Sequence, residues 1–356
     1  MAGVETTHRA QHSKEDLRGL DAASRPAGFE GYDAARTGAA VYERGPRGIL
    51  AIAGRDAVSF LHGILTNDIL HLAVGDACYG AYLTPQGRML ADMDVLRRAG
   101  DLWLDVEPGV REDLARRFDQ SLFTEDVRIL DRSDELRTIG VYGPGAGPAL
   151  ASALAEAGAP GDLPSPNRHT SSAVEGGDLV VLATDRGGIP GFHVFGPPQM
   201  VETIAASAIA RGAVPLGVLA AESLRIEAGL PRFGTDMTDD TIPLEAGIEK
   251  RAISMTKGCY VGQEVIVRIL HRGHGRVARR LVGLHIDGTA VPDPGARLVH
   301  DERDVGFVTS AVVSPRLGPI GLAYVHRDFI QPGTQLRLEG DGRSVTVSPL
   351  PFGADE

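Results

Sequence analysis

Apolar and polar positions along the first two thirds of the chain form short runs, some with the period of strands and others with the spacing of helices. The continuous apolar run at 48–53 predicts a buried strand, and Ala57, Leu61 and Ile64 have helical spacing just after it. Two apolar runs flank residues 84–87, whose Thr-Pro-Gln-Gly sequence predicts a β-hairpin. Further elements are predicted as strands at 101–106, 127–130 and 138–142 and as helices beginning at Pro108 and Pro197. This mixture of strands and helices predicts an α+β fold.

Beyond residue 276 the pattern changes to short strand-like runs separated by glycine, proline and aspartate turns. Many short strands at regular spacing are typical of a small β-barrel or sandwich. The predicted strands lie at 281–286, 305–313, 320–325, 335–338 and 345–348. We therefore expect a separate all-β module at the C-terminus.

Other segments lack either period. Residues 1–45 carry scattered charges of both signs and predict a disordered polar tail, with order expected near Gly48. Residues 157–177 are rich in Gly, Pro, Ser and Asn and predict a long surface loop. The glycines at 143–147 do not complete a GxGxxG fingerprint, so a structural turn is favoured over a phosphate cradle. The expected division is a tail at 1–45, a mixed region at 46–275 and the β-module at 276–356.

Composition narrows the class of protein. The 356 residues hold 36 basic and 47 acidic side chains, and the net charge of −11 disfavours a surface devoted to phosphate binding. Cys78 and Cys259 form no CxxC pair, so neither a disulfide framework nor a cysteine zinc site is expected. No window of about 18 apolar residues predicts a membrane helix, and residues 1–25 lack the apolar core of a secretory signal. We expect a cytoplasmic, reduced protein without membrane contact.

Charged side chains are concentrated among glycines and prolines between residues 223 and 264. Arg225, Glu227 and Glu245 lie in such segments, where Gly229 and Pro231 are predicted to end a helix. Buried carboxylates and guanidinium groups need partners, so this combination costs stability if it serves packing alone. We therefore predict ligand contact in this block.

Cys259 lies two residues after Lys257, which is one of only three lysines in the chain. Fixed positive charge near a thiol favours the thiolate and raises its reactivity. The alternative is a buried structural cysteine, and we keep that interpretation for Cys78 because its neighbours predict a strand. For Cys259 we favour a functional role.

Five arginines occur in residues 268–280, and no acidic residue lies between Glu264 and Asp287. Such a run either forms a solvated face or binds a polyanion, such as a ligand carboxylate tail or RNA phosphate. No aromatic residues are interleaved with these arginines, so a surface that stacks on bases is poorly supported.

The sequence KGCYVGQE at 257–264, preceded by RIEAGLPRFG at 225–234 and IPLEAG at 242–247, closely resembles the YgfZ family of folate-binding proteins. These proteins are relatives of the glycine-cleavage T-protein, an aminomethyltransferase. Shorter matching pieces precede them in the right order, at 60–63, 66–68, 83–92 and 142–144. The resemblance implies an α+β cloverleaf of three modules around a central folate site, with two interleaved modules in 46–275 and a C-terminal β-barrel.

The resemblance also implies a cofactor and site residues. The cofactor would be tetrahydrofolate or a one-carbon derivative, and Asp92 matches the catalytic aspartate of T-proteins, while Ala91 replaces the acid before it. The position of the family's pterin-binding glutamate falls on His193, which leaves Glu227 and Glu245 as candidate acceptors. The predicted catalytic residues are Cys259, Asp92 and Lys257, and the predicted folate contacts are Asp92, Asn67, Arg225, Glu227, Glu245, Tyr260, Gln263 and Glu264, with no metal ligand.

Three functions compete at this point. The leading expectation is a YgfZ-like accessory protein that supports assembly or repair of iron–sulfur client proteins, including a tRNA-modifying one, with Cys259 as its reactive thiol. The alternative is a tetrahydrofolate-dependent aminomethyl- or methyltransferase of the T-protein type, which Asp92 favours. The third is an RNA-associated module that uses the arginines of 268–280. Whether the protein is an enzyme stays open here, with the accessory role preferred.

Overall fold

The computed structural model describes residues 27–185, 187–273 and 275–353. Part of the predicted tail, residues 1–26, lies outside the described residues. The rest of it is folded, because helix α2 (Tyr32–Thr37) and strand β1 (Ala40–Glu43) both precede residue 45. Tyr32 and Ala35 are buried, so this segment packs against the rest of the protein. Its elements are too short to show a sustained apolar period in the sequence.

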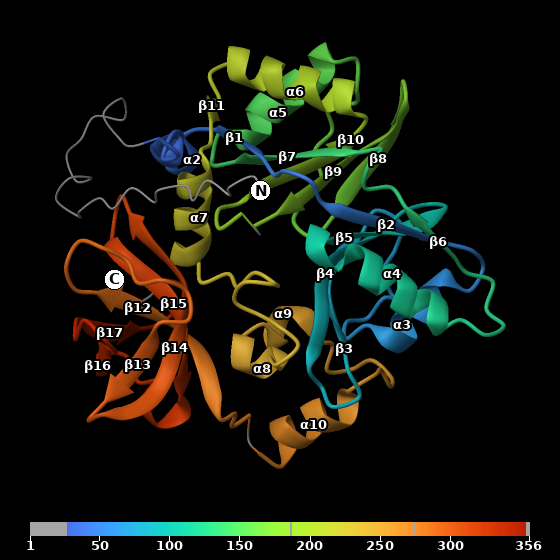
Figure 1. The fold of residues 1–356 in the computed structure, drawn as a ribbon. Coiled ribbons are helices and arrows are strands. Elements are labelled where there is room, and N and C mark those ends of the chain that lie inside the picture. Colours follow the sequence, from blue (N-terminus) through green and yellow to red (C-terminus); the bar gives the residue numbers. More distant parts are fainter. Residues whose placement is uncertain (1–26, 186, 274, 354–356) are drawn as a thin grey trace, which may run out of the picture.

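The first module is a five-stranded sheet with strand order β3-β4-β5-β2-β6 (Figure 1). Its strands are β2 (Gly48–Ala53), β3 (Ala77–Leu83), β4 (Met89–Arg97), β5 (Asp101–Val106) and β6 (Arg128–Asp131). Helices α3 (Ala57–Ile64) and α4 (Arg111–Gln120), the latter preceded by the 3-10 turn η2 (Pro108–Val110), contribute Leu61 and Phe118 to the core beneath it. All five strands lie where the sequence predicts them.

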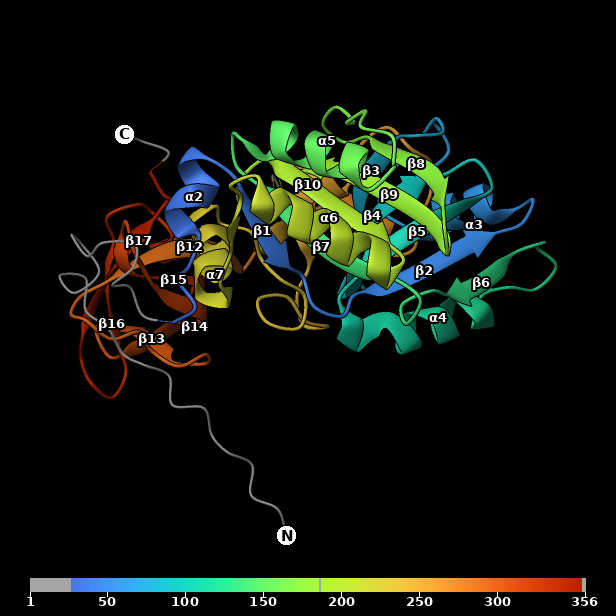
Figure 2. The ribbon, with the colours of Figure 1, turned by 90° about the horizontal axis from the view of Figure 1, so that it is seen from above.

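The second module is a six-stranded sheet with order β11-β1-β7-β10-β9-β8, covered on one face by two helices (Figure 2). Its other strands are β7 (Arg137–Tyr142), β8 (His169–Val174), β9 (Gly177–Thr184), β10 (Gly191–Gly196) and β11 (Val214–Pro215), and its helices are α5 (Ala146–Glu156) and α6 (Pro198–Ala210). The loop predicted at 157–177 is therefore partly wrong, because β8 lies within it. The two sheets pack through a shared apolar layer that includes Trp103, Leu182 and Phe195.

The C-terminal module is a closed six-stranded barrel, which decides between the two predicted all-β forms. Its strands are β12 (Arg279–Ile286), β13 (Arg297–His300), β14 (Arg303–Ser314), β15 (Gly318–His326), β16 (Gln335–Leu338) and β17 (Ser344–Ser348), with the 3-10 turn η3 (Arg327–Phe329). The predicted α+β class with a C-terminal β-barrel is confirmed.

Four helices lie between the sheets and the barrel (Figure 1). They are α7 (Val218–Glu227), α8 (Pro243–Ala246), α9 (Glu249–Ala252) and α10 (Gln263–His271), the last being a segment for which no helix was predicted. The charged block singled out in the sequence thus connects all three modules.

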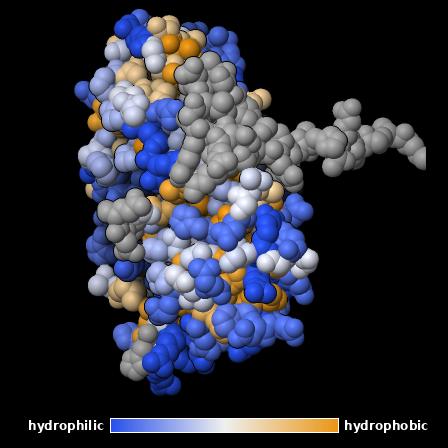
Figure 3. Space-filling view, turned by 90° about the vertical axis from the view of Figure 1, so that its left-hand side faces the viewer, coloured by the Kyte–Doolittle hydropathy of each residue, from blue (hydrophilic) through white to orange (hydrophobic). Residues whose placement is uncertain are grey.

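Figure 3 shows hydrophilic residues over most of one face, with hydrophobic residues scattered among them. Among the helices that the structure describes, none has the length and apolar character needed to cross a membrane.

Candidate functional site

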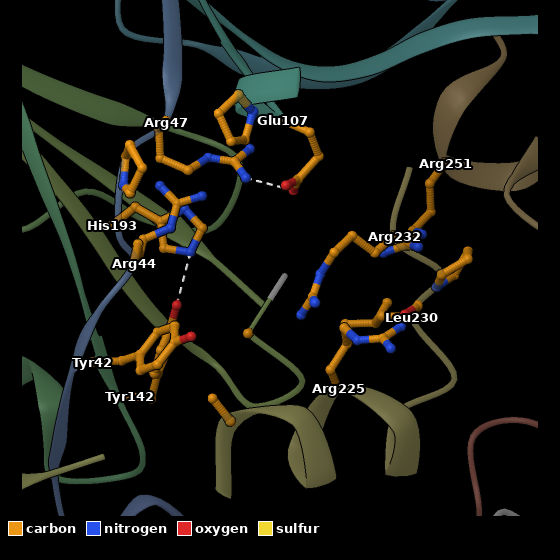
Figure 4. Close-up of a pocket in the computed structure, with 15 residues that line it drawn as sticks. Tyr42, Arg44, Arg47, Glu107, Tyr142, His193, Arg225, Leu230, Arg232 and Arg251 are labelled. Carbon is orange, nitrogen blue, oxygen red and sulfur yellow. Dashed lines mark hydrogen bonds and ion pairs between the residues drawn. The ribbon is translucent and has the colours of Figure 1, made fainter. Parts of the chain in front are cut away.

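A cavity of about 350 Å³, here called cavity A, opens between the six-stranded sheet, the end of β5 and α7 (Figure 4). Its walls carry tyrosine, histidine, arginine and one glutamate side chain. The lining residues include Tyr42, Arg44, Arg47, Glu107, Tyr142, His193, Arg225, Arg232 and Arg251.

The inner wall is held by a buried ion-pair network around Asp105 on β5. Its two carboxylate oxygens accept from Arg47 Nε at 2.7 Å and Arg44 Nη2 at 2.8 Å. Arg47 also donates to Glu107. Burial opposes ionisation of Asp105, but the charges of Arg44 and Arg47 outweigh it and hold the pKa of that carboxyl well below its usual range. Asp105 is therefore ionised at neutral pH, and its two ion pairs hold Arg44 and Arg47 in this wall.

His193 and Tyr142 form the neighbouring part of the wall. His193 is buried on β10, and its Nε2 lies 3.1 Å from the Tyr142 hydroxyl on β7 (Figure 4). Burial raises the pKa of Tyr142 to about 12, so its hydroxyl stays protonated. Asp94, Asp105 and His193 bring ligand atoms within 4.8 Å of one another. Since both oxygens of Asp105 serve arginines, this group is better described as part of the ion-pair network than as a metal centre.

The opposite wall comes from α7 and the glycine-rich segment after it. Arg225 is buried and donates to Asp236 at 2.7 Å and to Glu222 at 2.5 Å. Arg232 donates to Glu222 at 2.8 Å. Arg251 differs, because no carboxylate pairs with it in the part of the chain that the structure describes. It is the charge in this wall that remains available to an anionic ligand.

Arg251 also lines two further cavities, which places it where three hollows meet. Cavity B, of about 390 Å³, includes Asn67, Tyr79 and Asp94. A third hollow of about 510 Å³ lies against the barrel and includes Gly229 and Leu281. The Arg251 guanidinium carbon lies 5.4 Å from the centre of the Tyr79 ring, a cation–π geometry. The three modules thus surround a common central space.

Asp92 lies on β4, on the face turned toward this centre. Its side chain is buried, and its Oδ2 accepts a 2.7 Å hydrogen bond from the Tyr79 hydroxyl on β3. The register of the hairpin pairs Asp92 with Ala81, two residues from Tyr79 on the same face. The predicted acid is therefore next to the residues of cavity B.

Asn67, another predicted folate contact, lies on the rim of cavity B. Its Nδ2 donates to the carbonyl oxygens of Tyr79 at 2.8 Å and Arg251 at 3.0 Å. Asn67 therefore joins β3 to the segment that carries Arg251. The structure brings these two residues together although they are far apart in the sequence.

The sequence predicts that the charge of Lys257 acts on the Cys259 thiol, but the structure directs its ammonium elsewhere. Its ammonium donates to the carbonyl oxygens of Leu65 at 2.6 Å, Asn67 at 3.2 Å and His62, at the C-terminal end of α3. Burial lowers the pKa of Lys257 to about 8, opposed by the charge of Asp68. This position makes Lys257 a cap for the free carbonyls of α3.

The rest of the KGCYVGQE segment divides into exposed and structural residues. Cys259 and Glu264 are exposed, Gln263 is half-buried at the start of α10, and Tyr260 is buried under the Lys257 ammonium. Gly262 has φ +83°, and a Cβ there would meet the Thr84 carbonyl oxygen at 2.5 Å. The segment therefore packs against the tip of the β3–β4 hairpin.

Glu227 and Glu245 do not line cavity A and so are not placed to contact a ligand there. Glu227 accepts from Tyr32 at 2.6 Å and Ser314 at 2.5 Å, which joins α7 to α2 and to the barrel. Glu245 pairs with Arg279 at 3.2 Å. Neither carboxylate is among the residues that line cavity A.

The five arginines of 268–280 fall into two groups, one paired with carboxylates and one exposed. Arg279 and Arg280 pair with Glu245 and Glu249 and so join α8 and α9 to the barrel. Arg268, Arg272 and Arg276 are exposed. Their exposure leaves the choice between a solvated face and polyanion binding open.

Several residues of the central cavities have no counterpart in the sequence predictions. Tyr79, Arg44 and Arg251 come from three separate segments and meet only in the fold. The alternation of side chains in the predicted hairpin could have indicated that Tyr79 lies near Asp92, because the hairpin places both residues on one face of the sheet. Nothing in the sequence around Arg251 indicates its role.

Two sheets and a closed barrel around a central, arginine-lined space define the class of glycine cleavage T-protein folds. The GCVT N-terminal domain matches residues 23–257, and the glycine cleavage T-protein C-terminal barrel domain matches residues 279–352. The chain belongs to this aminomethyltransferase family.

Curated relatives and a solved structure agree with that assignment. An aminomethyltransferase of Rubrobacter xylanophilus is 30% identical over 350 residues, which are 97% of this chain and 92% of the relative. One from Bacillus velezensis is 29% identical over 87% of this chain and 85% of the relative. The crystal structure of aminomethyltransferase T from Bartonella henselae superposes with a TM-score of 0.80 at 24% identity, covering 90% of this chain and 88% of that one, and confirms the T-protein-like fold.

These relatives overturn the leading functional expectation. They are aminomethyltransferases, so the accessory role in iron–sulfur protein assembly is wrong, and iron–sulfur clients and tRNA modification lose their support. The resemblance is shown at the level of the T-protein family and not of the YgfZ family. Tetrahydrofolate, the one-carbon carrier of aminomethyltransferases, is confirmed as the expected cofactor.

Proposed function

We propose that this chain is a tetrahydrofolate-dependent aminomethyltransferase, which moves a one-carbon unit from an aminomethyl donor to tetrahydrofolate. The observation that carries the proposal is the position of Asp92, a buried carboxylate fixed by Tyr79 beside the central cavities of a T-protein fold. Tetrahydrofolate would supply the amines that accept the one-carbon unit.

The chemistry assigned to Asp92 follows from its charge and its fixed position. Release of an amine from an aminomethyl group develops positive charge on the carbon that is transferred, and a nearby carboxylate stabilises that charge. The hydrogen bond from Tyr79 fixes one oxygen of Asp92, so the other is oriented before the donor arrives. Asp92 would also orient the accepting amine of the folate.

The central space fits a ligand with a polar ring and a carboxylate tail. Three contiguous hollows meet at Arg251, which has no carboxylate partner among the described residues and could pair with a tail carboxylate. Asn67 holds the backbone carbonyl of Arg251 and so positions that segment. Arg225 would act by shaping the wall of cavity A, because its donors serve Asp236 and Glu222.

The remaining predicted residues keep narrower proposals. Tyr260 and Lys257 would hold the segment that follows α9, while Gln263 and Glu264 would position the start of α10 against the hairpin. Cys259 would be a reactive thiol because it is exposed. A cytoplasmic place of action also stays a proposal, based on the polar character of the sequence.

RNA association through the exposed arginines in and just after α10 is a second proposal with its own test. Arg268, Arg272 and Arg276 are exposed. Contacts with phosphate would make tRNA binding weaken steeply between low and physiological salt. Binding that does not change with salt, or no binding at all, would contradict it.

The transferase proposal is tested by calorimetric titration with tetrahydrofolate and by an assay for tetrahydrofolate-dependent release of amine from an aminomethyl donor. We expect the wild type to bind and to turn over, and Asp92→Asn to bind within a few-fold but to lose about 100-fold or more in turnover. Tyr79→Phe is the matched control, because it keeps the charge and removes only the hydrogen bond, and we expect a smaller loss. A wild-type protein that binds no tetrahydrofolate would refute the proposal.

A further inference from the structure

Arg44, at the inner end of cavity A, carries a buried donor without a partner. Its side chain is only 10% exposed and lines the cavity (Figure 4). Nη2 donates to Asp105, and the guanidinium carbon lies 5.6 Å from the centre of the Phe195 ring. Nη1 is buried and has no hydrogen-bond partner in the described part of the chain. A buried donor left unpaired is costly, so a group from outside the chain is the natural acceptor.

The side chains around Arg44 do not supply that acceptor. Both oxygens of Asp105 already accept from Arg44 and Arg47. Glu107, the other carboxylate at this end of the cavity, accepts from Arg47. Arg44 is also fixed in place by the ion pair and the ring, so its donor is oriented before any ligand arrives.

Arg98 is a second arginine with buried nitrogens that make no hydrogen bond, but it lies away from cavities A and B. Its Nε and Nη1 are also buried without a hydrogen bond, but its guanidinium stacks 4.2 Å from the centre of the Trp103 ring and pairs with Asp178. It lies at the contact between the two sheets and is not among the residues that line cavities A or B. Arg98 is therefore a matched control for the effect of altering a buried arginine.

We propose that Arg44 is a specificity-determining residue, whose Nη1 donates a hydrogen bond to an acceptor oxygen of the folate bound in cavity A. This inference rests on the proposed function and adds the contact by which the ligand is selected. The oxygen has three sources in a folate: the carbonyl of the pterin ring, the carbonyl of the benzoyl amide and a carboxylate of the glutamyl tail. All three present a lone pair that a guanidinium N–H recognises.

The test compares Arg44→Lys with Arg98→Lys and the wild type, using calorimetric titration with tetrahydrofolate and with tetrahydropteroate, which lacks the glutamyl group. Lysine keeps a positive charge beside Asp105 but loses the planar second donor. We expect Arg44→Lys to bind tetrahydrofolate about 10- to 100-fold more weakly, as for loss of a hydrogen bond from a charged donor. Arg98→Lys should bind within about twofold of the wild type.

The two ligands distinguish the source of the oxygen. A contact with the ring carbonyl or the benzoyl oxygen weakens binding of both ligands to Arg44→Lys, whereas a contact with the glutamyl tail weakens binding of tetrahydrofolate alone. If Arg44→Lys binds both ligands within about twofold of the wild type, the role of Arg44 is refuted while the proposed function stands. If the wild type binds no tetrahydrofolate, both fall together.

Thermal unfolding of each ligand-free variant shows whether the fold is kept. If Arg44→Lys does not fold, Arg44→Met combined with Asp105→Asn removes both partners of the ion pair and leaves Arg47 paired with Glu107. The same loss of tetrahydrofolate affinity is then expected relative to Asp105→Asn alone. Equal affinities of these two variants would overturn the inference.

Discussion

Asp105 illustrates how single residues in this protein combine structural and site roles. It is buried between two arginines that line cavity A, and the ion pairs depress the pKa of its carboxyl. A group whose pKa is lower in the folded protein than in the unfolded chain stabilises the fold above the unfolded pKa. That contribution is lost as the pH falls below about 4, the ordinary pKa of aspartate.

We therefore predict that Asp105→Asn lowers the free energy of unfolding by about 3–5 kcal/mol at pH 7, because it leaves two buried arginines short of their partner. The difference from the wild type should shrink as the pH falls from 5 to 3, since the aspartate of the unfolded chain then becomes protonated while the carboxyl of the folded protein stays ionised. Urea unfolding at several pH values measures both. A difference that stays constant down to pH 3 would contradict the ion-pair explanation.

The two cysteines differ in a way that alkylation can measure. Burial, with the charges of Asp94 and Asp68, raises the pKa of Cys78 to about 12, whereas Cys259 is exposed. Because the thiolate is the reacting species, iodoacetamide at pH 8 should label Cys259 much faster than Cys78 in the folded protein. Peptide mass spectrometry separates the two sites. Labelling in denaturant, where both should react alike, is the control, and fast modification of Cys78 in the folded protein would refute the prediction.

At the residue scale, the local sequence indicates which charged residues are candidates for the site, but it does not indicate which of them contact one another. Arg225 was selected for its place among glycines, and the structure does put it in the wall of cavity A. Lys257 was paired with Cys259 by proximity in the sequence, but the structure turns its ammonium toward α3. Contacts between segments almost 200 positions apart depend on the fold, and no local pattern carries them.

Among the secondary-structure elements, α3 depends most directly on a distant residue. The helix has only eight residues, and no side-chain hydrogen bond caps its N-terminus. A short helix gains little from its own hydrogen bonds, so tertiary contacts decide its stability. The Lys257 ammonium provides such a contact at the C-terminal end.

We predict that Lys257→Met lowers the free energy of unfolding by about 1–3 kcal/mol, because it leaves partly buried carbonyls of α3 and the following turn without a donor. Lys250→Met is the matched control, since Lys250 is exposed and we expect a change within about 0.5 kcal/mol. Amide exchange should quicken in α3 of the first variant only. Equal effects of the two substitutions would exclude the capping role.

Prediction at this scale succeeded where burial imposes a strong pattern. Strand β2 is buried along almost its whole length, and its apolar run was recognised. Strand β8 has only His169 buried, so its polar sequence lacks the apolar run of a buried strand and predicts a loop instead. Helix α10 buries only Ile266, and the arginines of 268–280, most of which follow the helix, are the more prominent signal in that part of the sequence.

For the whole molecule, the key feature is that the barrel is joined to the cavity by buried polar groups. Asp236 accepts from Arg225 in the wall of cavity A, and also from Thr309 at 2.5 Å and Ser310 at 2.7 Å on β14. The change in pattern at residue 276 revealed a separate barrel but not this connection, because the sequence gives no sign of which hydroxyls face Asp236. The fold and the site are thus stabilised by the same contacts.

We therefore predict that Asp236→Ala loosens the barrel and weakens ligand binding together. Removing this carboxylate leaves Arg225 with one fewer buried partner and should cost about 3–5 kcal/mol. Hydrogen exchange should quicken in β14 and β15 more than in β2, and tetrahydrofolate affinity should fall because the wall of cavity A is no longer fixed. Asp304→Ala is the matched control. Asp304 pairs with Arg297 within the barrel but is half-exposed, and such pairs contribute under about 1 kcal/mol. If Asp236→Ala quickens exchange in the barrel yet binds tetrahydrofolate like the wild type, the barrel would be a separate stabilising module and not a part of the binding site.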